Sequence, residues 1–357
     1  MRFFVLLVGF LISWNCHAGA PKINSAKNKT PVSACKHHSD PIDEEKFVSA
    51  NGIEHWVTIK GARCDNPVIL FLHGGPANPM SPFSEAIYGT WKKEFTLVQW
   101  DQRGSGKTYI RNPAVADSPL SIELMANDGV AIAEYLRQYL HQSKVILMGS
   151  SWGSALGLQM VKTHPELFSA YIGTAQLVAQ HSNQAASYTQ TLNRARAEGQ
   201  TEIVESLEKI GSPPWDNPRH FGVLRRATKV LEARRTTPAP KTRWLPAPSY
   251  QMERMEAQYE AAEEYSFIQF VGMKNDGMYA QLDFPAKGYD FALPVFLVQG
   301  EEDLVTVSDV SKAYFEQIQA PQKAYFLVAK TGHNPNPLSV AMEYKVLKEH
   351  VLPLLKH

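Results

Sequence analysis

The chain has 357 residues and a net charge of +1, because 36 lysine and arginine side chains nearly balance 35 aspartate and glutamate side chains. Without a basic surplus, we expect no nucleic acid partner and no attraction to acidic lipid surfaces. The length exceeds what a single hydrophobic core usually holds, which favours a core together with a second unit.

The amino terminus has the layout of a secretory signal peptide. Arg2 precedes an apolar run over residues 3–12, and a boundary of small residues ends at Ala18. The run is too short to span a bilayer comfortably, although an uncleaved membrane anchor is the alternative. We expect cleavage after Ala18 and export to a periplasmic or extracellular compartment, which leaves residues 19–44 as a polar extension without a stable membrane anchor.

Two cysteines remain beyond this cleavage point, Cys35 and Cys64. An even pair in an oxidising compartment favours a disulfide, and two free thiols are the alternative. His37 and His38 follow Cys35 closely, but this single cluster lacks the second ligand pair of a zinc site. We therefore expect no metal.

Residues 45–177 are predicted to form the first part of an α/β core. Residues 47–53 and 55–59 predict a hairpin around an Asn51-Gly52 turn. A fully apolar strand, typical of a parallel sheet buried on both faces, is predicted at residues 67–72. Further strands are predicted at residues 95–100 and 145–148, with a helix that begins at Ser121. This alternation predicts a mostly parallel sheet with helices on both faces and a functional site at the carboxyl edge of the strands.

Residues 178–285 interrupt the alternation. They are polar and helix-prone, with breaks at residues 211–214 and 237–248, and they predict an inserted helical cap, or lid. Strand character then returns, so residues 286–357 are expected to complete the core. The predicted elements there are strands at residues 294–299 and 323–328 and a terminal helix with Val340, Tyr344, Leu347 and Val351 on one face.

A candidate nucleophile follows the strand at residues 145–148. The sequence Gly-Ser-Ser-Trp-Gly over residues 149–153 fits G-x-S-x-G, in which a strained turn between strand and helix exposes the hydroxyl of the central serine. Glycine is required on both sides because side chains there would collide with the turn. Ser151 is the expected nucleophile, and the N–H of Trp152 at the start of the following helix can meet an oxyanion.

A serine hydroxyl needs a base, and the base needs an acid that orients it. Among the histidines beyond residue 303, His350 and His357 lie in or after a helical pattern, whereas His333 lies in a loop after a strand, where a catalytic histidine is expected. Asp303 is the expected acid. Its rivals are Glu301 and Glu302, and a solvated acidic turn is the alternative for all three.

The second oxyanion donor is expected at Gly75. The sequence His-Gly-Gly-Pro over residues 73–76 follows the first buried parallel strand, and a glycine there lets the backbone approach a substrate. A plain tight turn is the alternative. The side chain of Trp152 is expected to form a wall of the pocket, with a place in the core as the alternative.

Together these motifs resemble the proline iminopeptidase family of α/β-hydrolases. The resemblance covers roughly residues 45–357 and rests on HGGP (73–76), WDQRGSGKT (100–108), GSSWG (149–153), GEED (300–303) and GHNP (332–335). It implies an α/β-hydrolase fold, a triad of Ser151, Asp303 and His333, and an oxyanion hole at Gly75 and Trp152. It also implies an aminopeptidase that prefers proline at the amino terminus. Asp101 and Arg103 match a segment that in this family shapes the floor of the site, and we interpret them as structural.

The resemblance further implies that glutamates of the lid hold the free amino terminus of the substrate. The nearest supply is an acidic helical face, for which a solvated surface is the alternative: Glu253, Glu256, Glu260 and Glu263. We expect one or two of them to face the cleft.

The expected partner is a small peptide or a small acyl substrate. A carboxylesterase or lactonase would use the same triad, and a non-catalytic binding protein on a hydrolase fold is a third possibility. Dehalogenases and epoxide hydrolases are excluded because they need a carboxylate at the position of Ser151. No cofactor is expected, since Gly104 to Thr108 lacks the upstream glycine of a phosphate-binding loop.

Overall fold

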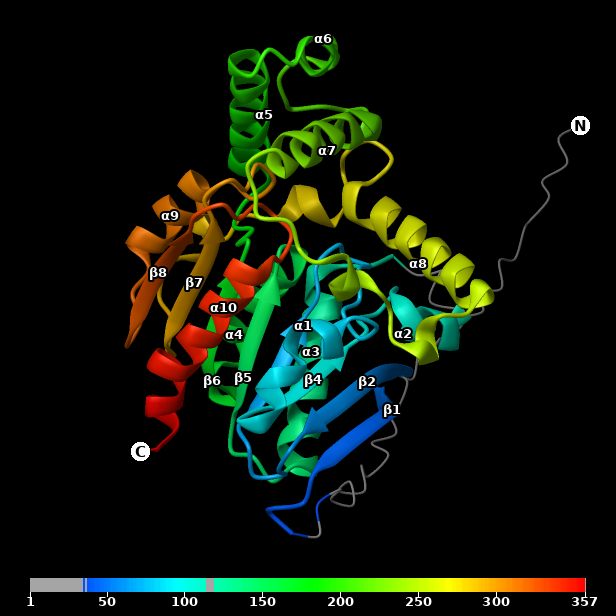
Figure 1. Ribbon diagram of the computed structural model, residues 1–357, viewed down its shortest axis with the longest axis vertical. Helices are drawn as coiled ribbons and strands as arrows, with labels where there is room; N and C mark the ends of the chain where they lie inside the picture. The colour runs from blue at the N-terminus through cyan, green and yellow to red at the C-terminus, as the bar shows by residue number, and fades with distance from the viewer. Residues whose placement is uncertain (1–34, 36, 114–118, 357) are drawn as a thin grey trace, which may run out of the picture. The chain divides into compact units, whose positions relative to one another are not determined.

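The computed structural model describes residues 35, 37–113 and 119–356, all within one unit of residues 31–357. The expected signal peptide, and the extension up to residue 34, lie outside the described residues. Within the described chain, eight strands form one sheet in the order β1-β2-β4-β3-β5-β6-β7-β8 (Figure 1). The strands are β1 (Ile42–Ala50), β2 (Ile53–Gly61), β3 (Val68–Leu72), β4 (Thr96–Trp100), β5 (Val145–Ser150), β6 (Phe168–Thr174), β7 (Val295–Gly300) and β8 (Lys323–Val328).

The sheet begins with the predicted hairpin. Strands β1 and β2 pair antiparallel across Asn51 and Gly52, which both have positive φ angles, +46° and +80°, as a tight hairpin turn requires. Strand β2 also runs antiparallel to β4, and the other pairs, from β4 to β8, are parallel. The mostly parallel α/β sheet is therefore confirmed. Strand β6 was not among the predicted elements.

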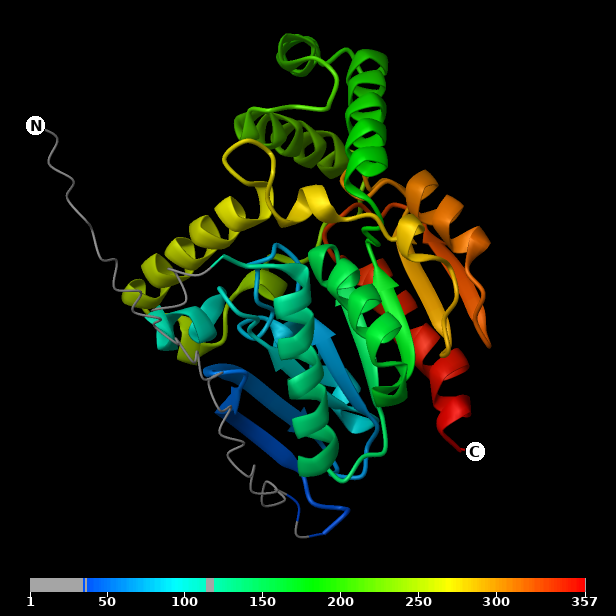
Figure 2. The same cartoon turned by 180° about the vertical axis from the view of Figure 1, so that it is seen from behind.

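Helices cover both faces of the sheet. Helices α1 and α10 pack on one face, and α3 and α4 pack on the other (Figures 1 and 2). Ser121 caps α3 as predicted, since its hydroxyl accepts a hydrogen bond from Leu124 N at 3.1 Å. The helices are α1 (Ser84–Tyr88), α2 (Gly106–Arg111), α3 (Ile122–Tyr139), α4 (Trp152–Thr163), α5 (Gln180–Ala197), α6 (Thr201–Ile210), α7 (Pro218–Ala233), α8 (Glu253–Val271), α9 (Ser308–Gln317) and α10 (Pro337–Val346).

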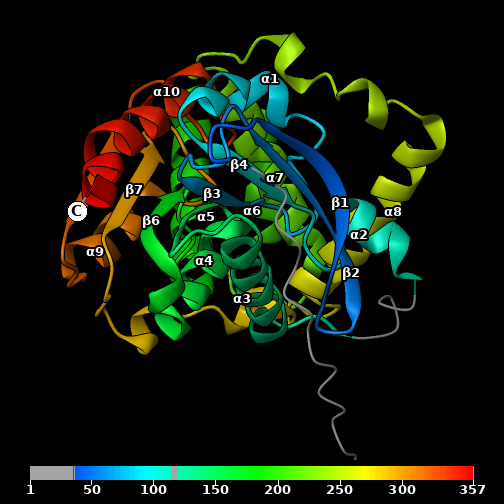
Figure 3. The ribbon, with the colours of Figure 1, turned by 90° about the horizontal axis from the view of Figure 1, so that it is seen from below.

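The two faces of each central strand supply two separate cores. In β3, Leu70 and Leu72 belong to the core under α3 and α4, whereas Ile69 and Phe71 belong to the core under α1 and α10. All five residues of β3 are buried, which explains why the strand reads as a continuous apolar run. Seen from below, the sheet extends from β1 on one side of the view to β7 on the other, with helix α9 beside β7 (Figure 3).

The segment between β6 and β7 is helical, as expected for the lid. Helices α5 to α8 lie beyond the carboxyl ends of the strands (Figure 1). The predicted breaks fall after α6, which ends at Ile210, and between α7 and α8, where only short 3-10 turns occur at Lys241–Trp244 and Pro248–Tyr250. The domain boundaries themselves stay predictions. No helix within the described ranges has the length and apolar character to cross a membrane.

Cys35 and Cys64 form the predicted disulfide. Their Cα atoms lie 6.0 Å apart, and the bond joins the segment before β1 to the turn after β2 across a separation of 29 residues. Cys64 is buried against the core under α3, so the bond attaches the chain before the sheet to the core itself.

Replacing both cysteines by alanine should lower the free energy of unfolding by about 3.5 kcal/mol. The disulfide closes a loop of this length in the unfolded chain and so lowers the entropy of the unfolded state, an effect that the double variant lacks. Urea unfolding followed by fluorescence, with and without reductant, measures the change. The double variant should not respond to reductant. A wild-type protein that is equally stable in reductant would contradict the stabilising bond.

Candidate active site

Ser151 occupies a strained turn between β5 and α4. Strand β5 ends at Ser150, α4 begins at Trp152, and Ser151 between them has φ +54° and ψ −119°. This left-handed region disfavours any side chain, so the turn persists only because its surroundings hold it. The Ser151 N–H donates to Thr174 O of β6 at 3.0 Å, which fixes one side of the turn.

The two glycines of the motif are needed for close packing. A Cβ atom on Gly149 would lie 2.3 Å from Gly153 O, and a Cβ atom on Gly153 would lie 2.1 Å from Leu72 O. Both separations are far inside van der Waals contact. The strand, the turn and the helix can therefore approach one another only with glycine at both positions, as the sequence predicted.

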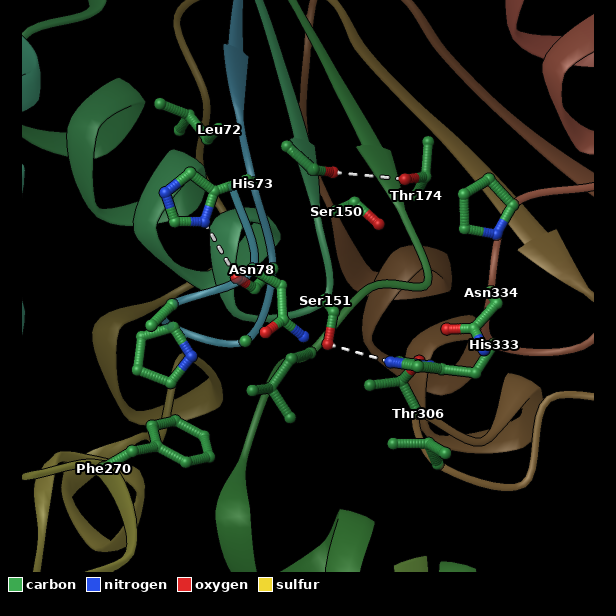
Figure 4. A pocket seen from close by; sticks show the side chains of 18 of the residues that line it. Leu72, His73, Asn78, Ser150, Ser151, Thr174, Phe270, Thr306, His333 and Asn334 are labelled. Carbon is green, nitrogen blue, oxygen red and sulfur yellow. Dashed lines mark hydrogen bonds between the residues drawn. The ribbon is translucent and has the colours of Figure 1, made fainter. Parts of the chain in front are cut away.

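The structure brings the three predicted triad residues together. His333 Nε2 lies 3.0 Å from Ser151 Oγ (Figure 4). On the other side of the ring, His333 Nδ1 lies 3.1 Å from Asp303 Oδ2. These distances are within hydrogen-bond reach on both sides of the ring. Ser151 follows β5, Asp303 follows β7 and His333 follows β8, so the carboxyl edge of the sheet supplies all three side chains.

Asp303 is held as a carboxylate by a dense set of donors. Val305 N and Thr306 N donate to Oδ1 at 2.8 and 2.9 Å, and Thr306 Oγ1 and Gln299 Nε2 donate to Oδ2 at 2.7 and 3.0 Å. Burial alone would raise the pKa of Asp303, but the nearby His333 charge and these hydrogen bonds outweigh it and hold the pKa below its usual value. An ionised acid is thus available to orient His333.

The two rivals of Asp303 lie elsewhere. Glu302 forms an ion pair with Arg194 of α5, with 2.9 Å between Oε2 and Nη1, and Glu301 is exposed. Neither carboxylate contacts His333 within the described residues. The geometry therefore favours Asp303.

The two backbone N–H groups predicted for the oxyanion hole belong to Gly75 and Trp152. Gly75 lines the cavity at Ser151 with φ +110°, and a Cβ atom there would lie 2.3 Å from Ala77 N, so only glycine fits. Trp152 begins α4, and the N–H of a first helical residue has no partner within its own helix.

The expectation that the Trp152 side chain forms a pocket wall is wrong. Its indole is fully buried, donates from Nε1 to Gln102 Oε1 at 3.0 Å and packs edge-on against the Phe270 ring at 5.5 Å between centroids. The first side chain of α4 points back into the core. Phe270 of α8 takes the expected place on the cavity wall.

Asp101 and Arg103 make structural contacts, in agreement with their interpretation. Asp101 accepts hydrogen bonds from Ser81 Oγ at 2.5 Å and Lys107 N at 2.9 Å, and burial raises its pKa to about 6. Arg103 pairs with the buried Asp128 through Nε at 2.6 Å. These contacts fix the loop after β4 beneath the site.

A cavity of about 400 Å³ contains Ser151 and His333 in its wall. Much of the lining is apolar, including Phe71, Met148 and Phe270, and the size suits a small substrate. Figure 4 shows Phe270 on one side of Ser151 and His333 on the other.

Of the four predicted lid glutamates, Glu263 lines this cavity. It is exposed and lies on α8, two turns before Phe270. Glu256 and Glu260 are exposed and do not line the cavity. The side chain of Glu253 lies outside the described residues.

Sequence reasoning missed Glu232 of α7. Its Oε1 accepts from Leu304 N at 2.9 Å and its Oε2 accepts from His333 N at 2.8 Å, so one lid carboxylate holds the loops of both Asp303 and His333. Burial and the nearby charge of Asp303 raise the pKa of Glu232. A signal was present: Glu232 follows Leu224, Thr228 and Leu231 on the buried face of α7, where a charged residue is unusual.

Glu343 of α10 was also missed. It lines the cavity with only 3% of its surface exposed, and its buried Oε2 has no hydrogen-bond partner in the described chain. Burial raises the pKa of Glu343 to about 8, with a smaller opposing effect of Arg243. Within the described ranges, no three His, Cys, Asp or Glu side chains form a group that could hold a metal ion.

The comparison with known families agrees with this geometry. The sequence profile described as "alpha/beta hydrolase fold" matches residues 67–339. The chain belongs to this family. The matched residues include the serine turn at Ser151 and His333 after β8, two of the features on which the predicted resemblance depends.

Relatives of this α/β-hydrolase include peptidases. "Probable aminopeptidase YbaC" of Bacillus subtilis (strain 168) is 26% identical over 310 residues, which span 85% of this chain and 95% of that protein. "Proline iminopeptidase" of Neisseria meningitidis is 35% identical over 102 residues, 29% of this chain and 30% of that protein. The resemblance to proline iminopeptidases is thus confirmed, at modest identity.

Solved structures share the fold of this α/β-hydrolase. VinJ has a TM-score of 0.64 at 16% identity, covering 87% of this chain and 99% of its own. The proline iminopeptidase of Mycobacterium smegmatis has a TM-score of 0.61 at 18% identity, covering 88% and 98%. At these identities the similarity establishes the fold alone.

Glu343→Gln should alter how stability depends on pH. The folded pKa of about 8 lies above the usual 4.5, so the folded protein binds the extra proton between these values and wild-type stability falls as pH rises from 4.5 to 8. Glutamine cannot ionise. The variant should match the wild type near pH 5 and exceed it at pH 9 by on the order of a few kcal/mol.

Urea unfolding at the two pH values measures this difference. Glu349→Gln, an exposed glutamate close by in the chain, serves as the control and should change little at either pH. A Glu343→Gln effect of equal size at both pH values would contradict a buried, titrating carboxyl.

Proposed function

We propose that the protein is a serine hydrolase that works through an acyl-enzyme, and that it is an aminopeptidase resembling proline iminopeptidase. The observation that carries the proposal is the 3.0 Å contact between Ser151 Oγ and His333 Nε2, with the Asp303 carboxylate at the other ring nitrogen. The full-length similarity to "Probable aminopeptidase YbaC" supports the choice of a peptide bond as the target.

Acylation would begin with attack of Ser151 Oγ on the carbonyl carbon of the scissile amide. His333 Nε2 accepts the hydroxyl proton, and Asp303 stabilises the resulting imidazolium through Nδ1. The tetrahedral oxyanion is directed towards the N–H groups of Trp152 and Gly75, where the start of α4 adds a favourable dipole.

The leaving group departs on the histidine side. His333 returns its proton to the amine nitrogen as the carbon–nitrogen bond breaks, which leaves an ester between Ser151 and the acyl group. A water molecule then attacks this ester and gives its proton to His333. His333 passes that proton to Ser151 Oγ as the bond between Oγ and the acyl carbon breaks, and the free amino acid leaves. The site needs no cofactor for either step.

The amino terminus of the substrate is assigned to Glu263. An aminopeptidase must pair a cationic ammonium close to the scissile carbonyl, because burying that charge without a partner is costly. Glu263 is the member of the predicted acidic face that reaches the cavity. It lies on α8, the helix of Phe270, and Figure 4 shows Phe270 on the other side of Ser151 from His333. The acyl half of the substrate would therefore extend towards α8.

A carboxylesterase or lactonase is the second candidate. Two of the predicted lid glutamates face away from the cavity, and the lining is rich in apolar side chains such as Phe267 and Phe270. Such a lining also suits an uncharged acyl group. The two candidates differ in their response to loss of Glu263.

Export stays part of the proposal. The disulfide between Cys35 and Cys64 supports it, because such bonds persist in oxidising compartments.

Ser151→Ala should reduce turnover of an aminoacyl anilide by about 10⁶-fold without unfolding the protein, because alanine fits the turn but cannot attack. Asp303→Asn should cost about 10⁴-fold by leaving His333 in the wrong tautomer. Initial rates and far-ultraviolet circular dichroism measure both effects. Glu302→Gln is the matched control and should stay within a few-fold, whereas a larger loss in Glu302→Gln than in Asp303→Asn would overturn the assignment of the acid.

Glu263→Gln should raise KM for aminoacyl amides by about tenfold, the factor that a lost interaction of about 1.4 kcal/mol produces. Short uncharged esters should be hydrolysed as before. The matched control is Glu260→Gln on the same helix, outside the cavity, which should affect neither substrate. Equal effects of Glu263→Gln on amides and esters would favour the esterase.

A further inference from the structure

Arg225 places an unpaired positive charge in the wall of the cavity. It lies on α7, lines the same cavity as Ser151, and is partly buried. Among the described residues, its guanidinium forms no hydrogen bond and no ion pair. A guanidinium offers five N–H donors, and burying it without a partner is costly.

The acidic groups close to Arg225 are already occupied. Glu232 and Asp303 are the charged neighbours that influence it most, yet neither forms an ion pair with it. Both oxygens of Glu232 accept backbone N–H groups, from Leu304 and His333. The positive charge of Arg225 therefore offsets the negative charges of Glu232 and Asp303 without direct contact, and its N–H donors stay available to a ligand.

A second donor without a partner lies in the same wall. The side-chain amide Nε2 of Gln184, on α5, makes no hydrogen bond in the described chain, and only 2% of the surface of Gln184 is exposed. Its Oε1 already accepts from Gln180 Nε2 at 2.9 Å. Two unused donors in the wall formed by α5 and α7 suit an anion.

The course of α7 locates Arg225 along the substrate. Phe221 packs against the Phe270 ring, with 6.5 Å between centroids, and Glu232 is bonded to His333 N. Arg225 lies between them, one turn beyond Phe221, and feels the charges of Glu232 and Asp303. It thus faces the half of the cavity next to His333.

In the proposed mechanism, the leaving group occupies the half of the cavity next to His333. His333 protonates the departing nitrogen, so this nitrogen and whatever it carries lie beside the histidine. When a free dipeptide or tripeptide is cleaved, the leaving group carries a carboxylate. Guanidinium and carboxylate match in charge and in planar geometry.

We propose that Arg225 binds a carboxylate of the leaving group, and that the preferred substrates are short peptides with a free carboxyl terminus. This inference rests on the proposed aminopeptidase function. It adds a cationic subsite at α7 to the anionic subsite at Glu263, so that the cavity complements both charged ends of a short zwitterionic peptide.

The test compares three matched substrates with the same amino-terminal residue: Pro-Ala, its carboxyl-terminal amide Pro-Ala-NH₂, and Pro-Asp-NH₂, which carries the carboxylate on a side chain. The wild type should cleave Pro-Ala with a kcat/KM about 10- to 100-fold above that of Pro-Ala-NH₂, the range expected for one charge-assisted contact. A gain for Pro-Asp-NH₂ over Pro-Ala-NH₂ would show that the side-chain carboxylate also reaches the subsite.

Arg225→Gln should abolish this preference by raising KM for Pro-Ala, and Arg225→Lys should retain part of it. Prolyl anilide has no carboxylate, and its hydrolysis by both variants should match that of the wild type. Arg226→Gln is the matched control: Arg226 is exposed on the same helix and lines a separate surface pocket against α6. It should leave all substrates unchanged.

Two results would overturn this inference alone. In the first, the wild type cleaves Pro-Ala and Pro-Ala-NH₂ equally well. In the second, Arg225→Gln lowers activity on every substrate alike, as the loss of a structural role near the triad would. Wild-type cleavage of prolyl anilide separates these failures from failure of the proposed function. If no aminoacyl substrate is cleaved at all, both proposals fall together.

Discussion

Ser151 holds a left-handed backbone conformation, with φ +54°, that costs a non-glycine residue about 1–3 kcal/mol. The surrounding packing keeps it there: α4 can lie against Leu72 O only because Gly153 has no side chain, and Thr174 O accepts the Ser151 N–H. The same turn directs the hydroxyl to His333 and lies directly before the first N–H of α4, which is the proposed oxyanion donor. In the proposed mechanism, the position of the Ser151 hydroxyl, its activation by His333 and the stabilisation of the oxyanion all depend on this one turn.

Helix α7 connects the lid to the triad through buried charge. Glu232 bonds the backbone beside Asp303 and the backbone of His333, so the geometry of acid and base depends on a residue of the inserted segment. Glu232 also packs so closely against the His333 loop that a Cβ atom on Gly332 would lie 2.5 Å from Glu232 Oε2. The lid is therefore part of the site's framework as well as its cover, and Arg225 shares the helix that performs both roles.

The sequence predicted what local rules determine. The hairpin at Asn51, the parallel strands, the serine turn and the pairing of Ser151 with His333 and Asp303 follow from turn chemistry, apolar runs and motif order. Residues whose role depends on packing between distant segments could not be found in this way: Glu232, Arg225 and Glu343 belong to no motif and meet the site only because α7 and α10 reach it. The prediction that the Trp152 side chain lines the pocket was wrong for the same reason, because the rotation of α4 about its axis is set by packing against the core.

The central claim, that Ser151 is an activated nucleophile, is tested most directly by covalent labelling with a fluorophosphonate, which reacts with a serine when a base and an oxyanion hole assist it. Intact-mass and peptide-mass analysis after labelling should show one adduct per chain, on the peptide that contains Ser151, and an aminoacyl substrate should slow its formation. An unlabelled protein, or an adduct on another serine while Ser151 stays free, would contradict the account.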